Sequence, residues 1–290
     1  MSKLLFIPFV TIVCLLSSCS RPKPIGVGSK DSTEQHILAE ITAQHLEHRF
    51  PDTEIRRRFD LGDTRTVHQA LLNSEIGLYP EYSGLLITEI LKETPSDEAS
   101  VVLERARMEL KRISLLDFVA PLGFEARNVL VVKAADAEKL TTSSEAATSK
   151  TRWKVGLSYE FQNKETGLPS FNTYRFEMGA PLRSMKAEEL FKALTDNSVS
   201  LIIATDTDGH LTQSGFKVLA DDMKAFPPMQ AGLVVRDDVL SAEPKLRAAL
   251  NELSNKITLE TMRKLNADVD IHERKVPDVA KDFLKSAGLN

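Results

Sequence analysis

The sequence predicts an α/β fold of two lobes, with mostly parallel sheets flanked by helices and a cleft between the lobes. Short apolar segments alternate with amphipathic ones along the 290 residues, a pattern typical of strands that are followed by helices. This length also favours two lobes, because a single hydrophobic core rarely grows so large. In addition, two similar Val-rich segments, 128–133 and 231–236, each precede a polar turn far apart in the chain.

The expected elements follow from this alternation in chain order. The first strand, 25–28, leads into a helix that begins after Ser32, where Ser32 and Gln35 have the spacing of a capping box. Pro80 to Gly84 is expected to turn the chain after a strand at 76–79. Further strands or extended segments are expected at 54–59, 118–124, 128–132, 155–157, 199–204 and 232–235. Further helices are expected at 64–73, 95–113, 187–194, 245–253, 258–265 and 276–286.

The two Val-rich segments indicate how the chain divides into lobes. Each is predicted to be a strand next to a point where the chain crosses between lobes, near 124–128 and 217–222. Lobe one would then be discontinuous and comprise 25–124 plus 221–290, whereas lobe two would be 125–220. Small ligands usually bind in the cleft between such lobes.

The N-terminus, residues 1–18, has the features of a signal peptide. Lys3 provides a positive charge, and the mostly apolar stretch 4–16 is shorter than the roughly 20 residues that a membrane-spanning helix needs. We therefore expect the mature protein to be exported.

A lipid anchor is expected at the end of this segment. Residues 16–19 read Leu-Ser-Ser-Cys, which has the form of a lipobox and predicts that Cys19 is lipidated and that 19–24 form a tether. Cys14 would leave with the signal peptide, so no internal disulfide is expected. The protein would be anchored at the membrane, facing the periplasm or the cell exterior. The alternative is an ordinary signal peptide with an incidental cysteine.

Composition and motifs exclude several functions. A formal charge of −4 offers no basic excess for phosphates, so nucleic acid is not an expected partner. The sequence lacks a Walker A motif, a complete dinucleotide fingerprint and a nucleophile elbow, and no cofactor is expected. His45 and His48 share a helix, but no further ligands complete a metal site, and a solvated helix face is the expected role of both.

Six segments, in this order, give the chain a resemblance to a known family. They are Ile25-Gly-Val-Gly-Ser-Lys-Asp-Ser-Thr-Glu-Gln35, Leu78-Tyr-Pro-Glu-Tyr-Ser-Gly84, Pro121-Leu-Gly-Phe124, Thr207-Asp-Gly209, Asp221-Asp-Met-Lys-Ala-Phe-Pro-Pro228 and Val234-Val-Arg-Asp-Asp-Val-Leu240. From Ile25 to Leu289 the chain resembles the glycine betaine/choline/osmoprotectant substrate-binding proteins of ABC transporters. The resemblance implies a type II periplasmic-binding-protein fold.

The resemblance also implies where a ligand binds. The family surrounds a quaternary ammonium group with tyrosine rings, each worth about 2 kcal/mol when desolvated. When the family's segments are matched to this chain, the positions of these rings correspond to Tyr82, Asn128, a residue near Thr205, and Met229. Only Tyr82 is aromatic. A trimethylammonium site would then be weaker on the order of 10³-fold. We expect a different or weakly bound ligand that forms hydrogen bonds with Asn128 and Thr205 and a soft contact with Met229.

Further candidate residues lie on loops at strand ends. Lys30 could pair with a ligand carboxylate, and the helix start beside Asp31 and Thr33 offers free N–H groups. Asp31, Ser32 and Thr33 could instead only cap the helix.

In lobe two, the candidates follow two predicted strands. Tyr159 and Glu160 follow the strand at 155–157, and Asp206 follows the strand at 199–204. Glu160 or Asp206 could accept hydrogen bonds from a cationic ligand group. A solvated loop acid is the alternative for Glu160.

These features predict the substrate-binding lipoprotein of an ABC importer, which closes around a small zwitterionic compound. The expected partners are this ligand, the permease subunits and the membrane, and the protein is expected to be a monomer without enzymatic activity. One alternative is a ligand sensor that docks on a receptor and binds a different compound, such as an amino acid. An enzyme would need an acid/base pair in the cleft, for which Glu160 with Asp206 are the candidates.

Overall fold

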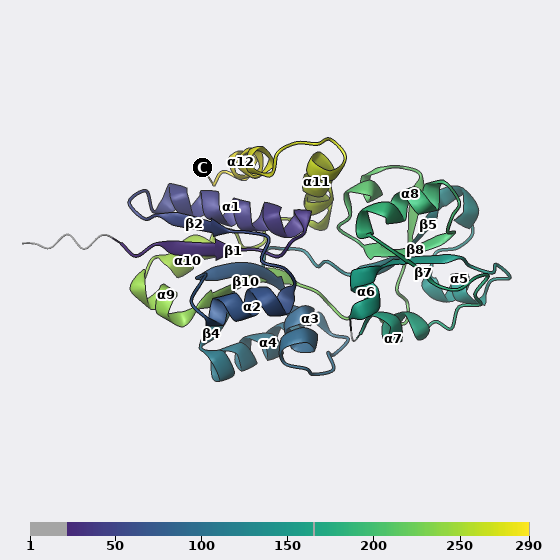
Figure 1. Ribbon diagram of the computed structural model, residues 1–290, viewed down its shortest axis with the longest axis horizontal. Coiled ribbons are helices and arrows are strands. Elements are labelled where there is room, and N and C mark those ends of the chain that lie inside the picture. Colours follow the sequence, from purple (N-terminus) through teal and green to yellow (C-terminus); the bar gives the residue numbers. More distant parts are fainter. Residues whose placement is uncertain (1–21, 165, 290) are drawn as a thin grey trace, which may run out of the picture.

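Two five-stranded sheets, each flanked by helices, form the two halves of the protein (Figure 1). The computed structural model describes residues 22–164 and 166–289. We call each sheet with its flanking helices the first half and the second half. The predicted signal peptide and Cys19 lie outside the described residues. No helix within the described ranges is long and apolar enough to cross a membrane.

The first half has the strand order β2-β1-β3-β10-β4. Its strands are β1 (Ile25–Gly28), β2 (Ile55–Arg58), β3 (Leu78–Tyr82), β4 (Leu116–Val119) and β10 (Ala231–Arg236). Strands β1, β2 and β3 are parallel, whereas β10 runs antiparallel to β3 and β4. Its helices are α1 (Thr33–Arg49), α2 (Thr64–Leu72), α3 (Ser83–Leu85), the π-helix η1 (Leu86–Ile90), α4 (Ala99–Ser114), α9 (Asp237–Ala242), α10 (Leu246–Asn251), α11 (Leu259–Asp270) and α12 (Val276–Ser286).

The second half has the strand order β7-β6-β8-β5-β9. Its strands are β5 (Asn128–Lys133), β6 (Val155–Ser158), β7 (Arg183–Met185), β8 (Leu201–Thr205) and β9 (Phe216–Leu219). Strands β6, β7 and β8 are parallel, and β5 is antiparallel to β8 and β9. Its helical segments are η2 (Ala134–Ala137), α5 (Ser143–Thr148), α6 (Tyr159–Asn163), α7 (Gly167–Asn172), η3 (Ala187–Glu189), α8 (Leu190–Thr195) and η4 (Gly209–Thr212).

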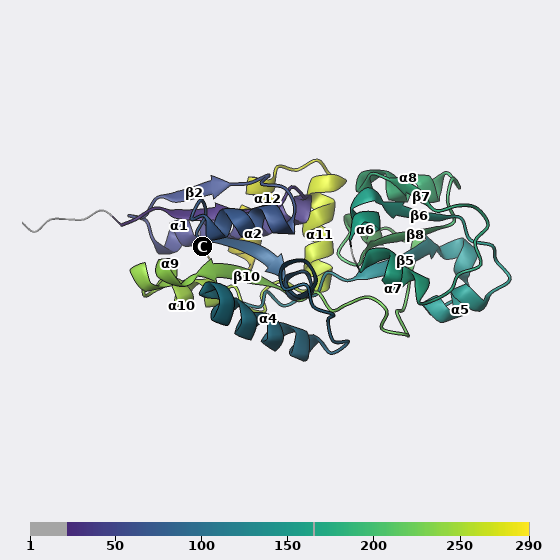
Figure 2. The same ribbon diagram turned by 60° about the horizontal axis from the view of Figure 1, so that its bottom comes forward.

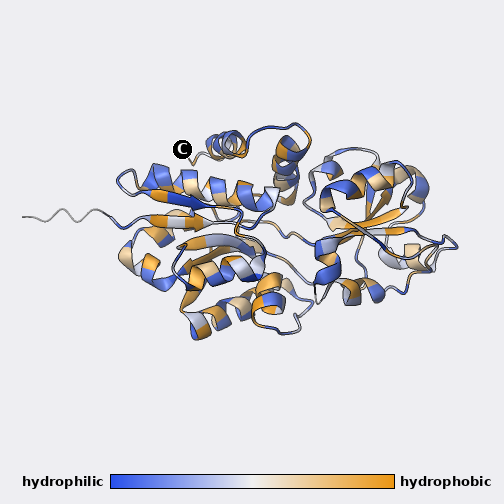
Figure 3. Ribbon diagram, viewed as in Figure 1, coloured by the Kyte–Doolittle hydropathy of each residue, from blue (hydrophilic) through white to orange (hydrophobic). Residues whose placement is uncertain are grey.

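Each sheet is buried on both faces, as expected for sheets of mostly parallel strands. Successive residues of β10 point to opposite faces, so Leu233 belongs to the cluster beneath α1 whereas Val234 packs with Tyr79 and Leu86. The hydropathy colouring shows apolar strands at the centre of both halves and polar outer helix faces (Figure 3).

The two segments that join the halves run side by side. The Ala126 N–H donates to the Met229 carbonyl at 2.9 Å, and the Ala231 N–H donates to the Phe124 carbonyl at 3.1 Å. One joining segment leads into β5 and the other into β10, and each of these strands is fourth in its sheet and antiparallel. The Val-rich segments are therefore strands, and they occupy equivalent places in the two sheets.

Three local predictions were wrong. Ser32 precedes α1, but its side chain makes no capping hydrogen bond, so the proposed capping box with Gln35 does not form. Residues 80–82 continue strand β3 instead of turning, because they pair with β10. His45 is fully buried, and its Nε2 lies 2.9 Å from the Ala249 carbonyl of α10, whereas His48 is exposed as expected.

Gly84 allows the start of α3 to pack directly against the second joining segment. A Cβ atom on Gly84 would lie 2.3 Å from the Pro228 carbonyl oxygen, whereas Gly215 has open space around the same position. We expect Gly84→Ala to lower the free energy of unfolding by about 1–3 kcal/mol through overpacking. Urea unfolding checks this, with Gly215→Ala as the control. Equal stability of the two variants would contradict the packing described here.

Candidate ligand-binding site

The carboxyl ends of parallel strands bring the site residues together in each half. Strands β1 and β3 are parallel neighbours, so Lys30 after β1 lies near Tyr82 at the end of β3. In the second half, β6 and β8 are parallel neighbours, and they lead into Tyr159 and Asp206. Helix α11 of the first half and helix α6 of the second lie on the sides of the halves that face each other in both views (Figures 1 and 2). Ligands commonly bind at such strand ends.

A buried ion pair lies beneath Tyr82. The Lys30 ammonium bonds to Oε1 of Glu81, and these two residues are 8% and 1% exposed. The same carboxylate oxygen accepts the backbone N–H of Tyr82 at 2.9 Å. The Lys30 ammonium also lies 4.7 Å from the centre of the Tyr82 ring. Tyr82 therefore already has a cation of the protein itself against its ring.

Glu34, in the first turn of α1, accepts the hydroxyl hydrogen of Tyr82 through Oε1. Its Oε2 accepts a hydrogen bond from Nδ2 of Asn266 at 2.8 Å. Burial raises the pKa of Glu34, while hydrogen bonds from Thr207, Tyr82 and Asn266 lower it. Burial and the nearby Glu34 carboxylate raise the pKa of Tyr82 well above its ordinary value. The phenol is therefore a hydrogen-bond donor at neutral pH.

Several polar atoms around Tyr82 are buried without a hydrogen-bond partner. Neither amide atom of Gln35 has a partner at full hydrogen-bond geometry. The side chain nevertheless lies close enough to Tyr82 for a hydrogen bond that lowers the phenol pKa. Ser29 Oγ, Glu81 Oε2 and Asn266 Oδ1 are also unpartnered. An unpaired buried polar atom costs about 1–3 kcal/mol. This concentration of donors and acceptors is typical of a site that binds a polar molecule.

In the second half, three predicted residues lie at neighbouring strand ends. Asn128 at the start of β5 pairs in register with Thr205 at the end of β8, and Asp206 follows. Oδ1 of Asp206 accepts the Arg127 backbone N–H at 3.0 Å. Burial raises the pKa of Asp206 to about 7, and the charge of Glu34 also raises it. Because Glu34 belongs to the first half, this effect links the two groups of residues.

Tyr159 and Glu160 begin α6 and are both exposed. A Glu160 oxygen pairs with Lys164 at 2.8 Å on the same helix. The charge of Lys164 lowers the pKa of Glu160, and the charge of Lys30 contributes in the same direction. Glu160 therefore lies within electrostatic range of the ion pair in the first half.

The remaining predicted ligand contacts differ in their exposure and in the residues that they touch. Asp31 is exposed, and Thr33 donates to Oδ1 of Asp270 on α11 at 2.7 Å. Met229 is 4% exposed and packs in the same cluster as Tyr82. The structure thus brings Lys30, Tyr82 and Met229 together. Their roles as ligand contacts stay predictions.

Four residues of this site were not predicted as ligand contacts. Glu34 and Gln35 were read only as part of a family segment and a cap, and Glu81 only as part of the motif before Tyr82. The available signal for Glu34 and Gln35 was their position at the start of the helix that follows the first strand. For Glu81 it was the position of an acid near the carboxyl end of a buried strand. Asn266 gave no such signal, because it lies in the middle of α11, far away in the chain.

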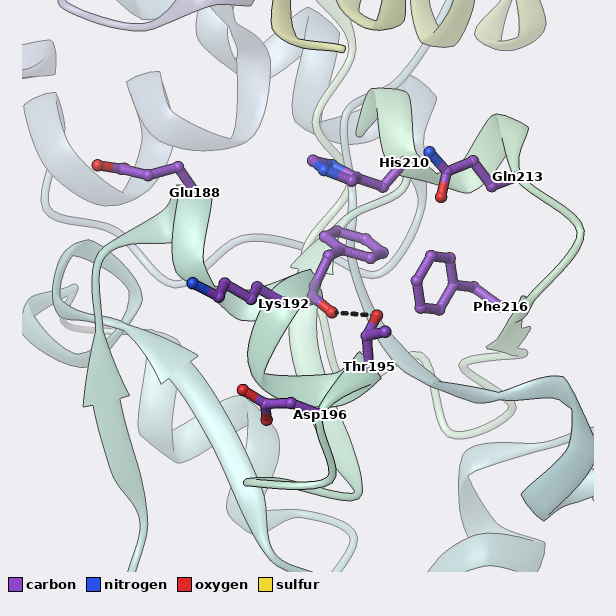
Figure 4. A pocket seen from close by; sticks show the side chains of 8 residues that line it. Glu188, Lys192, Thr195, Asp196, His210, Gln213 and Phe216 are labelled. Atoms are coloured by element: carbon purple, nitrogen blue, oxygen red, sulfur yellow. Dashed lines mark hydrogen bonds between the residues drawn. The ribbon is translucent and has the colours of Figure 1, made fainter.

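A separate hollow lies on the second half (Figure 4). It encloses about 260 Å³ and is lined by Phe191, His210 and Phe216, with polar residues at its rim. Its rings pack on one another, since Phe191 stacks on His210 with centroids 4.6 Å apart. None of the predicted ligand contacts lines it.

No metal site is evident in the part of the chain that the structure describes. Residues 22–164 and 166–289 contain no group of three or more His, Cys, Asp or Glu side chains placed to hold an ion.

Comparison with known proteins shows which family and which relatives this chain matches. The family model for the substrate-binding domain of ABC-type glycine betaine transport systems matches residues 23–286. The chain is 32% identical over 272 residues to an ergothioneine transport permease/ergothioneine binding protein of Helicobacter pylori. This match covers 92% of the chain but only 48% of that relative.

Two further relatives match over nearly their whole length. A carnitine transport binding protein of Listeria monocytogenes is 27% identical over 290 residues, covering 95% of this chain and 93% of the relative. A crystal structure described as a glycine betaine/carnitine/choline ABC transporter superposes with a TM-score of 0.83 at 25% identity. The superposition covers 91% of this chain and 99% of the chain in that structure. These matches confirm the predicted two-lobed α/β fold.

Asp206 gives the site a pH dependence that can be measured. Its raised pKa means that the folded state favours the protonated acid, so its contribution to stability is complete below about pH 4 and is lost as the pH rises through about 7. Asp206→Asn should therefore gain stability relative to wild type between pH 4 and pH 8. Urea unfolding across this range measures the difference. Parallel stability curves for the two proteins would disprove the perturbed titration.

Proposed function

Because the chain belongs to the family of substrate-binding domains of ABC-type glycine betaine transport systems, we propose that it carries a small zwitterionic compound to an ABC permease. Proteins of this family bind and do not transform their substrates. The proposed binding place lies between the halves, where Tyr82 and its polar neighbours meet the strand ends of the second half.

The observation that supports this proposal best is the set of buried polar atoms without partners around Tyr82. Gln35 offers both a donor and an acceptor, and Ser29 and Glu81 add further oxygens. A ligand with both kinds of hydrogen-bonding group would satisfy them and recover the free energy that their burial costs. The Tyr82 ring adds a surface for a cation on the face opposite Lys30.

The composition of the site suggests which zwitterion fits. Asn128, Thr205 and Met229 stand where a cage for a quaternary ammonium group would need rings, so the ring contribution comes from Tyr82. The acids Asp206 and Glu160 suit a ligand that carries N–H groups as well as a cation. We propose ergothioneine as the first candidate, because its imidazole ring carries such groups and the Helicobacter pylori relative is named for it. Carnitine and glycine betaine are the next candidates.

We further propose that Cys19 carries a lipid anchor and that residues 19–24 tether the protein to the membrane, on the periplasmic or exterior side. Residues 22–24, the last part of this segment, are described and lead directly into β1. We propose lobe boundaries at 25–124 plus 221–290 and at 125–220. The hydrogen bonds of Ala126 to Met229 and of Ala231 to Phe124 support the boundary near residue 124. An anchored receptor with two lobes keeps its ligand near the permease, and we propose that it acts as a monomer.

Ligand identity is tested by thermal shift of the purified protein, since a compound that binds only the folded state raises the melting temperature. Ergothioneine should give a larger shift than glycine betaine at equal concentration, with carnitine between them. Isothermal titration calorimetry should then give the same order of affinities. The proposal fails if none of these zwitterions shifts the melting temperature.

Tyr82→Leu removes the ring and keeps a buried apolar side chain. Loss of one desolvated cation contact of about 2 kcal/mol should weaken binding of the best zwitterion about 30-fold. Tyr79→Phe is the matched control, because Tyr79 is on the same strand but in the cluster on the other face of the sheet. Calorimetry should show unchanged affinity for this control. Equal affinity of Tyr82→Leu and wild type would remove Tyr82 from the site.

A further inference from the structure

Glu34 contacts both halves of the protein. In the first half, its two carboxylate oxygens accept hydrogen bonds from Tyr82 on β3 and Asn266 on α11. From the second half, the carbonyl of Thr207, which follows β8, accepts from the same Nδ2 of Asn266 that donates to Glu34. The Thr207 side chain also lies close enough to Glu34 to lower its pKa. A single carboxylate thus joins the aromatic ring of the site to a segment of the opposite half.

Asn266 strengthens the same connection. It is 4% exposed, and its Nδ2 donates both to Glu34 and to the Thr207 carbonyl, the latter at 2.9 Å. Next to it on α11, Arg263 donates from Nε to the Asp206 carbonyl. The bonds to the Thr207 and Asp206 carbonyls cross from α11 to the segment that follows β8.

The backbones in this contact are also packed closely. A Cβ atom on Gly209 would lie 2.5 Å from the Ala267 backbone nitrogen, so the segment 206–209 fits against α11 without room for a side chain. Thr207 is 1% exposed. Displacing this segment would therefore remove donors from a partly buried carboxylate and expose a tightly fitted surface.

We propose that Glu34 is a positioning residue that couples Tyr82 to the contact between the halves. A molecule bound against Tyr82 would hold the phenol toward Glu34, and Glu34 would in turn hold Thr207 and the segment 206–209 in place. Ligand binding then favours this arrangement of the halves because the bonds form together. The link to a ligand rests on the function proposed above, whereas the link between Tyr82 and Thr207 through Glu34 does not.

The ligand-free test measures amide hydrogen exchange of the peptide that covers 205–212 in the purified protein. Glu34→Gln should raise its exchange rate about tenfold, because the amide cannot accept from all three donors. Tyr82→Phe should raise the same rate severalfold by freeing Glu34 on its other side. In the Glu34→Gln background, adding Tyr82→Phe should have no further effect. Unchanged exchange in Tyr82→Phe, or additive effects of the two changes, would overturn the proposal.

Two further variants separate a specific effect of Glu34 from a general loss of structure. Glu47→Gln removes a carboxylate from the exposed end of the same helix, where it pairs with Arg57, and should leave exchange at 205–212 unchanged. Thr207→Val keeps the side-chain shape but removes the hydroxyl, and it should raise exchange as Glu34→Gln does. If Glu47→Gln raises exchange at 205–212 as much as Glu34→Gln, the effect is unspecific and the proposal is wrong.

The ligand-dependent test uses ergothioneine and carnitine as probes in stopped-flow binding. Glu34→Gln should raise the dissociation rate about tenfold and change the association rate little, because the lost bonds hold the bound arrangement. An equal loss in association rate with normal exchange at 205–212 would make Glu34 a simple ligand contact and contradict the coupling. If neither these probes nor glycine betaine binds wild-type protein, the proposed function fails, and the exchange measurements still decide the inference.

Discussion

The buried ion pair between Lys30 and Glu81 is the interaction on which the site depends. An isolated carboxylate as buried as that of Glu81 would cost several kcal/mol, and the Lys30 ammonium offsets this cost. The pair joins the ends of β1 and β3, and Glu81 also holds the backbone N–H of Tyr82. The ring is therefore fixed at the strand end with its hydroxyl directed to Glu34.

The repeated architecture of the halves explains why a site forms between them. Both sheets have three neighbouring parallel strands followed by one antiparallel strand, which enters directly from a joining segment. Each sheet therefore presents the carboxyl ends of its parallel strands, where the predicted residues lie except Asn128, which begins β5, and Met229, which lies on a joining segment. The joining segments are hydrogen-bonded to each other, so relative motion of the halves is confined to a short paired stretch.

The sequence was sufficient for the buried strands, the two Val-rich strands and the place of Lys30 and Tyr82. These depend on local patterns of apolar residues and on strand-to-helix order, and α12 matches its predicted bounds. The predictions that were wrong or missing concern features that depend on tertiary contacts. Glu34 and Asn266 meet although they are far apart in the chain, and the burial of His45 depends on α10 packing against α1. Residues 80–82 were expected to turn because of Pro80, yet pairing with β10 keeps them extended.

The central claim is that one small molecule is held between the halves against Tyr82. A crystal structure of the protein with ergothioneine, or with whichever zwitterion binds best, tests it most directly. The account predicts ligand density in contact with the Tyr82 ring, hydrogen-bonded to the Gln35 amide, and touching atoms of both halves. Ligand bound to one half alone, for example in the hollow beside Phe191 and His210, would contradict it.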